Sequence, residues 1–289
     1  MLDVATKKQT PTVRLRRLAA ELRRLRAAAE LSREEVTERT GINTATLYRI
    51  ETAKTRPQAR TLKALLDLYD ADDEQRQHLV TLSKEATKQG WLRPYHSDLP
   101  EEYTAYISFE AEASSVRNYE SLFIPGLLQT EAYARAVIAG VLPNATRQDI
   151  EDRVQARIER QQLLTQDDPL KLWAIVDEAA LRRAVGGPSV MRAQLAHLVD
   201  IATLPHLTLQ VITFESGAHT GMPGSFVLMD FPDPLDTDLI YIDSMAGDLF
   251  LEADADVRRF SSIFDNLRAT AASPDDSTKL MARLANDRE

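Results

Sequence analysis

Residues 32–51, SREEVTERTGINTATLYRIE, decide the fold at the start of the chain, because their pattern predicts two short helices joined by a tight turn. Ser32 and Glu35 have the spacing of a capping box, in which each side chain satisfies the other residue's backbone amide at the start of a helix. Val36 supplies the buried face of this helix. Gly41 suits the left-handed backbone conformation that commonly ends a helix.

The second helix of the pair starts just after the turn, where Asn43 or Thr44 can cap it. Leu47 and Ile50 lie three residues apart and mark its buried face. The outer surface is left to Thr44, Ala45, Thr46, Tyr48 and Arg49. An ordinary helical hairpin is the alternative, because Ser-x-x-Glu occurs widely, but the neighbouring segments decide against it.

Both flanking segments have leucines at helical spacing, which are Leu15, Leu18, Leu22 and Leu25 before the pair and Leu62, Leu65, Leu66 and Leu68 after it. The outer face of the first segment is rich in arginine. We therefore expect five helices in residues 13–87, with a helix-turn-helix formed by the second and third.

Four short strings in this region resemble the Xre family of helix-turn-helix domains, to which the lambdoid phage repressors belong: Leu25-Arg26, Leu31-Ser32, Gly41-Ile42 and Arg49-Ile50-Glu51-Thr52. In that family the second helix of the motif reads bases in the major groove and the first crosses the DNA backbone. The resemblance implies base contacts from Thr44, Ala45, Tyr48 and Arg49.

Four cations are the predicted phosphate contacts: Arg26, Arg33, Lys54 and Arg56. Arg33 stands where the family often has glutamine, so a base contact is not carried over to this position. Glu51 is expected to be structural and to pair with a nearby arginine, because a carboxylate does not favour a phosphate.

Charge is distributed unevenly along the chain. Residues 1–65 hold fifteen Lys and Arg against seven Asp and Glu, a balance of +8, whereas the whole chain carries −9, so the remainder carries −17. A basic end on an acidic body is typical of a chain in which one domain binds nucleic acid. A merely solvated positive face is the alternative.

The length of 289 residues allows two domains, each with its own core. We expect a flexible leader over residues 1–12, a helix-turn-helix domain over 13–88, a linker over 89–100 and a second domain over 101–289. The absence of cysteine excludes disulfides and cysteine-ligated zinc. No apolar run is long enough for a membrane span and the N-terminus is polar, so a soluble, cytoplasmic protein is expected.

The second domain mixes helical and extended patterns. Helices are predicted over residues 103–113, 130–139, 147–164, 189–202, 256–271 and 277–286, and strands over 116–123, 170–176, 208–214, 225–231 and 239–243, with a short one in 247–251. Consecutive strands on short connections predict an antiparallel sheet covered by helices, so the fold class is α+β overall behind an all-α N-terminal domain.

Several strings in this domain resemble the C-terminal domain of unknown function that follows an Xre domain in many actinobacterial regulators, including WhiJ-like developmental regulators. They are FIPGLLQT at 123–130, YARA at 133–136, DEAALRR at 177–183, QLAHL at 194–198 and GSF at 224–226. The resemblance implies a small neighbour-encoded protein partner. It identifies no binding residue.

The residues of the second domain give no enzyme motif. Its histidines lack the spacing of a metal site, Asp177 and Glu178 are better explained as helix caps, and the glycine-dotted segment 217–224 is better explained as a hairpin turn. The string at 125–128 fits a pocket wall and a buried corner equally well. We therefore expect no catalytic residue, no metal and no cofactor.

The leading hypothesis is a sequence-specific DNA-binding transcription regulator that binds double-stranded DNA as a homodimer and is modulated through its C-terminal domain. The first alternative is an antitoxin-like interaction module that holds a small partner and regulates its own expression. The second is a regulator that senses a small molecule, which predicts a sizeable apolar pocket in residues 97–289.

Overall fold

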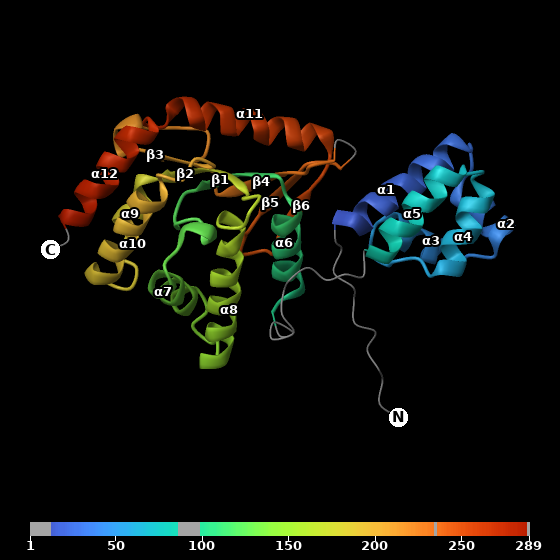
Figure 1. The fold of residues 1–289 in the computed structure, drawn as a ribbon, viewed down its shortest axis with the longest axis horizontal. Helices are drawn as coiled ribbons and strands as arrows, with labels where there is room; N and C mark the ends of the chain where they lie inside the picture. The colour runs from blue at the N-terminus through green and yellow to red at the C-terminus, as the bar shows by residue number, and fades with distance from the viewer. Residues whose placement is uncertain (1–12, 86–98, 234–235, 288–289) are drawn as a thin grey trace. The chain divides into compact units, whose positions relative to one another are not determined.

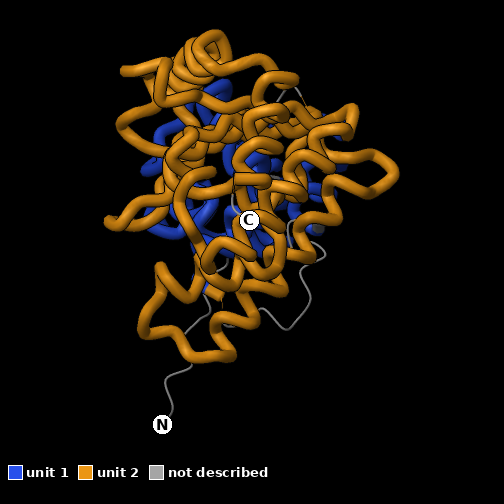
Figure 2. Tube along the Cα trace, turned by 90° about the vertical axis from the view of Figure 1, so that its left-hand side faces the viewer, with its two compact units in different colours: residues 1–91, 100–109 blue, residues 92–99, 110–289 orange. Residues whose placement is uncertain are grey.

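The computed structural model describes residues 13–85, 99–233 and 236–287. These residues form two compact units, shown in Figure 2. The first unit contains residues 13–85 and 100–109, and the second contains residue 99 and the described residues from 110 onward. The predicted leader and most of the predicted linker lie outside the described residues, so the domain boundaries stay predictions.

Five helices build the first unit from residue 13 to residue 85 (Figure 1). They are α1 (Val13–Ala28), α2 (Arg33–Thr40), α3 (Thr44–Glu51), α4 (Ala59–Leu68) and α5 (Asp73–Glu85). The predicted leucine stripes form the core, in which Leu18 and Leu22 of α1 and Leu65 of α4 belong to one buried cluster. Burial of one face of each amphipathic helix therefore holds this unit together, as the spacing predicts.

The second unit is built on a mixed sheet of six strands in the order β3-β2-β1-β4-β5-β6. The strands are β1 (Ser115–Glu120), β2 (Lys171–Asp177), β3 (Leu207–Ile212), β4 (Phe226–Asp230), β5 (Leu239–Ile242) and β6 (Leu249–Leu251). β1, β2 and β3 are parallel, and β4, β5 and β6 continue the sheet in antiparallel pairs.

The α+β class is confirmed. The predicted antiparallel pairing holds for three of the five strand pairs, whereas β1–β2 and β2–β3 are parallel, so the sheet is mixed. Helices separate β1 from β2 and β2 from β3, and such crossovers return the chain to the same end of the sheet, which makes the strands parallel. The glycine-dotted segment 217–224 does not turn a hairpin either. It belongs to the connection from β3, at the outer side of the sheet, back to β4 beside β1.

Helices cover both faces of the sheet. They are α7 (Glu131–Val141), α8 (Arg147–Arg160), α9 (Glu178–Arg182), α10 (Pro188–Ile201), α11 (Asp254–Thr270) and α12 (Pro274–Asn286). Helix α6 (Glu101–Glu112) belongs to the first unit up to residue 109 and to the second from residue 110. Figure 1 shows α11 along one face and α7 and α8 on the other. Short 3₁₀ turns occur at Gly126–Leu128, Gln161–Leu164 and Phe214–Ser216. Leu127 and Leu128 are buried, so the string at 125–128 forms a buried corner.

Alternate residues of the strands form the core beneath α11. Tyr119 of β1 lies opposite Ile175 of β2 and Phe226 of β4, and all three are buried with Phe264 and Leu267 of α11. Two-residue periodicity places these side chains on one face of the sheet. In the described part of the chain, no helix is both long enough and apolar enough to cross a membrane.

Candidate nucleic-acid interface

Helix α2 starts and ends with the predicted caps. The hydroxyl of Ser32 accepts a hydrogen bond from the Glu35 amide at 3.2 Å, and the Glu35 carboxylate accepts one from the Ser32 amide at 2.8 Å, which completes the capping box. Hydrogen bonds from the Ser32 backbone and side chain hold the pKa of Glu35 below its usual value. Gly41 ends the helix with a φ of 71°, and its amide donates to the Thr37 carbonyl.

Helix α3 is capped by Asn43, the first of the two predicted candidates. Its side-chain oxygen accepts a hydrogen bond from the Ala45 amide at 2.8 Å. Leu47 and Ile50 are buried, as their spacing predicts. Ala45, Tyr48 and Arg49 are exposed on the opposite surface, and Thr44 is half-buried at the start of the helix.

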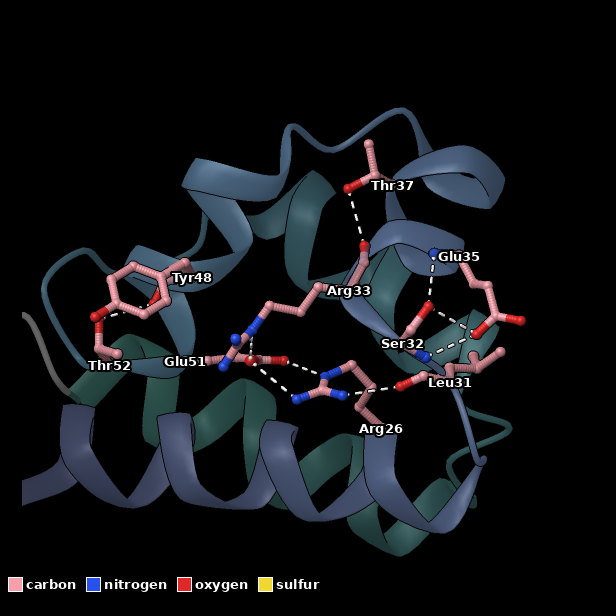
Figure 3. A network of polar contacts seen from close by, with 9 residues as sticks. All are labelled: Arg26, Leu31, Ser32, Arg33, Glu35, Thr37, Tyr48, Glu51 and Thr52. Carbon is pink, nitrogen blue, oxygen red and sulfur yellow. Dashed lines mark hydrogen bonds and ion pairs between the residues drawn. The ribbon is translucent and has the colours of Figure 1, made fainter.

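Glu51 fixes the orientation of α3 by binding two arginines, one from each neighbouring helix (Figure 3). Its side chain is fully buried. Arg26 of α1 donates from Nε to Oε1 at 2.6 Å and from Nη2 to Oε2 at 3.2 Å, and Arg33 of α2 donates from Nε to Oε2 at 2.7 Å. The prediction that Glu51 is structural and pairs with an arginine is confirmed.

Arg26 uses all three side-chain nitrogens inside the protein, because its Nη1 donates to the Leu31 carbonyl at 2.8 Å. The hydrogen bonds to Glu51 raise its pKa above the usual value, so the guanidinium stays charged. Arg33 contributes only Nε to Glu51 and is the more exposed of the two.

Tyr48 links two of the cations predicted to contact phosphate. The guanidinium carbon of Arg33 lies 5.4 Å from the centre of the Tyr48 ring, and Nζ of Lys54 lies 5.6 Å from it. A positive charge over an aromatic face is attracted by the ring's quadrupole. Arg33, Tyr48 and Lys54 are therefore held together beside α3, although they lie in different segments.

Thr44 joins a short chain of hydroxyl groups. Thr37 Oγ1 donates to the Arg33 carbonyl at 3.0 Å and lies 3.0 Å from Thr44 Oγ1. A hydroxyl has one proton to donate. Since Thr37 uses its proton on the carbonyl, Thr44 is the donor between the two, and the free capacity of its oxygen is that of an acceptor.

Arg56, the last predicted phosphate contact, is partly tied to the protein. Its Nη1 donates to the Ser83 carbonyl of α5 at 3.0 Å, so it helps to hold the segment after α3 against the last helix of the unit. The links made by Arg33 and Arg56 are not foreseeable from helical periodicity, because their partners lie outside the same helix.

Asp177 and Glu178 of the second unit hold backbone amides, as the prediction of helix caps requires for Asp177. Asp177 caps α9 by accepting from the Ala179 amide at 2.8 Å, as predicted, and its other oxygen lies 3.3 Å from Nε2 of His219. Glu178 accepts from the Phe214 amide at 2.8 Å. Among the described residues, no three His, Asp or Glu side chains are grouped as a metal site would require.

Two family models match the chain. A helix-turn-helix domain matches residues 17–79, and the domain of unknown function (DUF5753) matches residues 103–283. No curated protein and no solved structure gives a match. The first match identifies the α1–α5 unit as a helix-turn-helix domain, which is the class of fold found in DNA-binding regulators, and the second carries no description of an activity or partner.

Proposed function

We propose that this chain, which belongs to the DUF5753 family and carries a helix-turn-helix domain ahead of that region, is a sequence-specific DNA-binding transcription regulator. The observation that carries the proposal is that α3 is held in a fixed orientation. Glu51 of α3 binds Arg26 of α1 and Arg33 of α2, while Tyr48 and Arg49 remain exposed. A helix held in this way is a rigid reading element for the major groove. The likeness to Xre and WhiJ-like regulators supports the same conclusion.

Four side chains of α3 would read base edges. Arg49 suits a bidentate contact to guanine, and Ala45 suits the thymine methyl group. Thr44 offers an acceptor, which suits the amino group of adenine or cytosine. Tyr48 would contact bases beside them and would also support Arg33 and Lys54.

Phosphate contacts would come mainly from Arg33 and Lys54, which share the Tyr48 ring; Lys54 is exposed and Arg33 is half-buried. Arg56 would add a contact through the nitrogens that Ser83 leaves unused. Arg26 would act mostly through Glu51, because its nitrogens are already bound. Each phosphate neutralised would release counterions, so affinity should fall as salt rises.

The proposed protein works as a homodimer modulated through its second unit. A recognition helix of eight residues reads only a few base pairs, and proteins of this class use two half-sites about one DNA turn apart. An antitoxin-like module that binds a small neighbour-encoded protein remains the alternative. It predicts that such a protein alters DNA binding.

A ligand-sensing regulator is the further alternative, and the hollow at the turn between α7 and α8, of about 260 Å³, is smaller and more polar than the sizeable apolar pocket that it predicts. Its lining combines apolar side chains with charged ones: Leu99, Val141, Leu142, Pro143, Asp149, Asp152 and Arg153 are among them. Its volume lies just below the range usual for ligand pockets, roughly 300–1,000 Å³. Ligand sensing therefore predicts a small effector that raises the melting temperature of the chain.

A salt-dependent titration of the full chain tests the proposal. The DNA upstream of its own gene is compared with a scrambled duplex of the same composition. We expect tighter binding to the upstream DNA and a steep fall in affinity with salt for both duplexes. Well-folded protein that binds neither duplex above background would overturn the proposal, and specificity that needs an added small protein would favour the antitoxin-like alternative.

A further inference from the structure

One edge of the sheet collects the ends of the parallel strands. β1, β2, β3 and β5 end at this edge, while β4 and β6 start at it, because the register pairs Tyr119 with Phe226 and Ile242 with Leu249. We call this surface the carboxyl edge. It is formed by residues 121–125, 178–183, 213–225 and 243–249.

The exposed apolar side chains of the second unit gather there. In the described residues of this unit, seven large hydrophobic side chains are exposed, and six of them belong to the carboxyl edge: Leu122, Phe123, Phe214, Met222, Met245 and Leu249. The seventh, Val141, ends α7. Scattered exposed hydrophobic residues are normal, but a group on one surface marks an interaction site.

Hydrogen bonds hold these loops in place. The Ser121 amide donates to Ser225 Oγ at 3.0 Å, which joins the segment after β1 to the start of β4. A side chain at Gly221 would place Cβ only 2.5 Å from the Tyr119 ring, so the segment before β4 lies directly on the sheet. In the turn between β5 and β6, Ser244 Oγ donates to the Gly247 carbonyl at 2.8 Å. A surface ordered before binding loses little conformational entropy on association.

Opposite charges lie at the two sides of the carboxyl edge. Arg183 follows α9 beside β2, next to Arg182, which is already bound to Glu178 at 2.6 Å, whereas Asp243 follows β5. β2 and β5 are separated by β1 and β4, which is roughly 14 Å at about 4.8 Å per strand. Leu122, which follows β1, and Met222, which precedes β4, lie between the two charged sides.

This arrangement is complementary to itself under a two-fold rotation about the middle of the edge, between β1 and β4. The rotation brings Arg183 of one copy against Asp243 of the other and the central apolar side chains against each other, as an isologous interface requires.

We propose that the carboxyl edge is the homodimer interface of this protein and that its occupant is a second copy of the same edge. The inference rests on the proposed function, because reading two half-sites requires a dimer. The carboxyl edge would form that dimer, and its pattern of charges would select a second copy of the same chain.

Sedimentation equilibrium of the full chain gives the first test. We expect a dimer for the wild type and at least a tenfold higher dissociation constant for Leu122→Ser and for Met222→Ser. Arg192→Ser is the control, since it changes an exposed side chain of α10 in the same unit, outside the carboxyl edge. A monomeric wild type, or apolar variants that dimerise as tightly as the control, would overturn the inference.

Charge reversal gives the second test and does not depend on the apolar variants folding. Arg183→Glu and Asp243→Lys should each weaken the homodimer, because each places like charges together at both ends of the interface. Mixing the two variants should form a heterodimer, because the reversed charges then meet opposite ones. Absence of a heterodimer, or single variants that dimerise like the wild type, would overturn the proposed pairing.

The same variants separate this inference from the proposed function. A wild type that binds its DNA specifically while the edge variants remain dimeric leaves the function standing and refutes the interface. The opposite result is a wild type that shows no preference for its DNA, together with edge variants that become monomeric. That result supports the interface and refutes the proposed function.

Discussion

Arg26 of α1 and Glu51 of α3 are 25 positions apart in the sequence, yet Nε of Arg26 lies 2.6 Å from Oε1 of Glu51. Arg33 of α2 binds the other carboxylate oxygen, so one buried acid joins three helices. The site combines an apolar core with a buried ionic centre. Its arginines satisfy both oxygens, which is the condition under which a buried charge is tolerated.

Replacing Glu51 by Gln should destabilise the first unit by about 3 kcal/mol, because removing one partner leaves two arginines without a counter-charge in a partly buried setting. Hydrogen exchange of the α1 and α3 amides in the full chain measures the local free energy of unfolding. Glu21→Gln is the matched control, since it breaks an exposed pair with Arg24 that contributes less than about 1 kcal/mol. Equal effects of the two substitutions would contradict the structural role of Glu51.

Replacing Arg49 by Ala should lower specific DNA affinity by roughly 1–3 kcal/mol and relax the preference at one base pair. The reason is that its exposed guanidinium lies on the outer face of α3, where the family places base contacts. Gel-shift titrations with single base-pair substitutions measure both effects. Arg24→Ala removes an exposed arginine of α1 and should leave the sequence preference intact. The assignment of Arg49 would be refuted if Arg24→Ala lost the sequence preference and Arg49→Ala kept it.

Local patterns predicted the elements around this site, while contacts between distant segments were beyond them. The Ser32–Glu35 capping box and the burial of Leu47 and Ile50 follow from spacings of three residues, which the helix itself fixes. The partners of Glu51 do not, because Arg26 and Arg33 belong to other helices whose packing angles no short window specifies.

The same limit explains the error in the sheet. The pattern of residues 226–251 correctly indicated strands on short connections, and these strands are antiparallel. β1 and β2 are separated instead by α7 and α8, and a helical crossover indicates parallel pairing. β1 also pairs with β4, and the Asn118 side chain donates a hydrogen bond to the Phe226 carbonyl, 108 positions away. No pattern of neighbouring residues predicts a pairing between segments so far apart in the sequence.

Replacing Thr44 by Val should abolish a preference for a base pair that presents an amino group, with an effect of about tenfold. Its hydroxyl donates to Thr37 and is left to accept from DNA, whereas valine has no oxygen. Thr44→Ser should keep the preference. Selection of binding sites from a random duplex library compares the variants, with Thr46→Val as a control on the same helix. An unchanged site for Thr44→Val would mean that this hydroxyl serves only the contact between α2 and α3.

Replacing Lys54 by Ala should weaken binding to all sequences alike and reduce the slope of log affinity against log salt by about 1. Lys54 is exposed and its ammonium lies over the Tyr48 ring, which holds the charge beside α3. Titrations at several salt concentrations measure the slope. Lys63→Ala removes an exposed lysine of α4 that is not a predicted contact and should leave the slope unchanged. A change in sequence preference for Lys54→Ala would instead point to a base contact.

Glu120 at the end of β1 should make the second unit less stable as pH rises from about 4.5 to about 7. Burial raises the pKa of its carboxyl to about 7, an effect reinforced by Asp243 and opposed by hydrogen bonds from Ser225 and Asn118 and by Arg157. The folded state therefore holds this proton more tightly than the unfolded state, whose pKa is near 4.5. The stabilisation is fully present below the unfolded value and is lost as pH rises through the folded one.

Unfolding of the full chain at pH 5 and pH 8, followed by hydrogen exchange in the strands, measures this contribution. Glu120→Gln should remove it, so the variant loses less stability than the wild type between the two pH values. Because solvent reaches part of the residue, we expect less than the full penalty for burying a charge. Asp149→Asn is the control: hydrogen bonds from Thr146 lower the pKa of Asp149, so its contribution is lost only at more acidic pH and stays constant across this window. Parallel pH profiles for the wild type and Glu120→Gln would show that Glu120 is ionised throughout, with Arg157 and its hydrogen bonds outweighing burial.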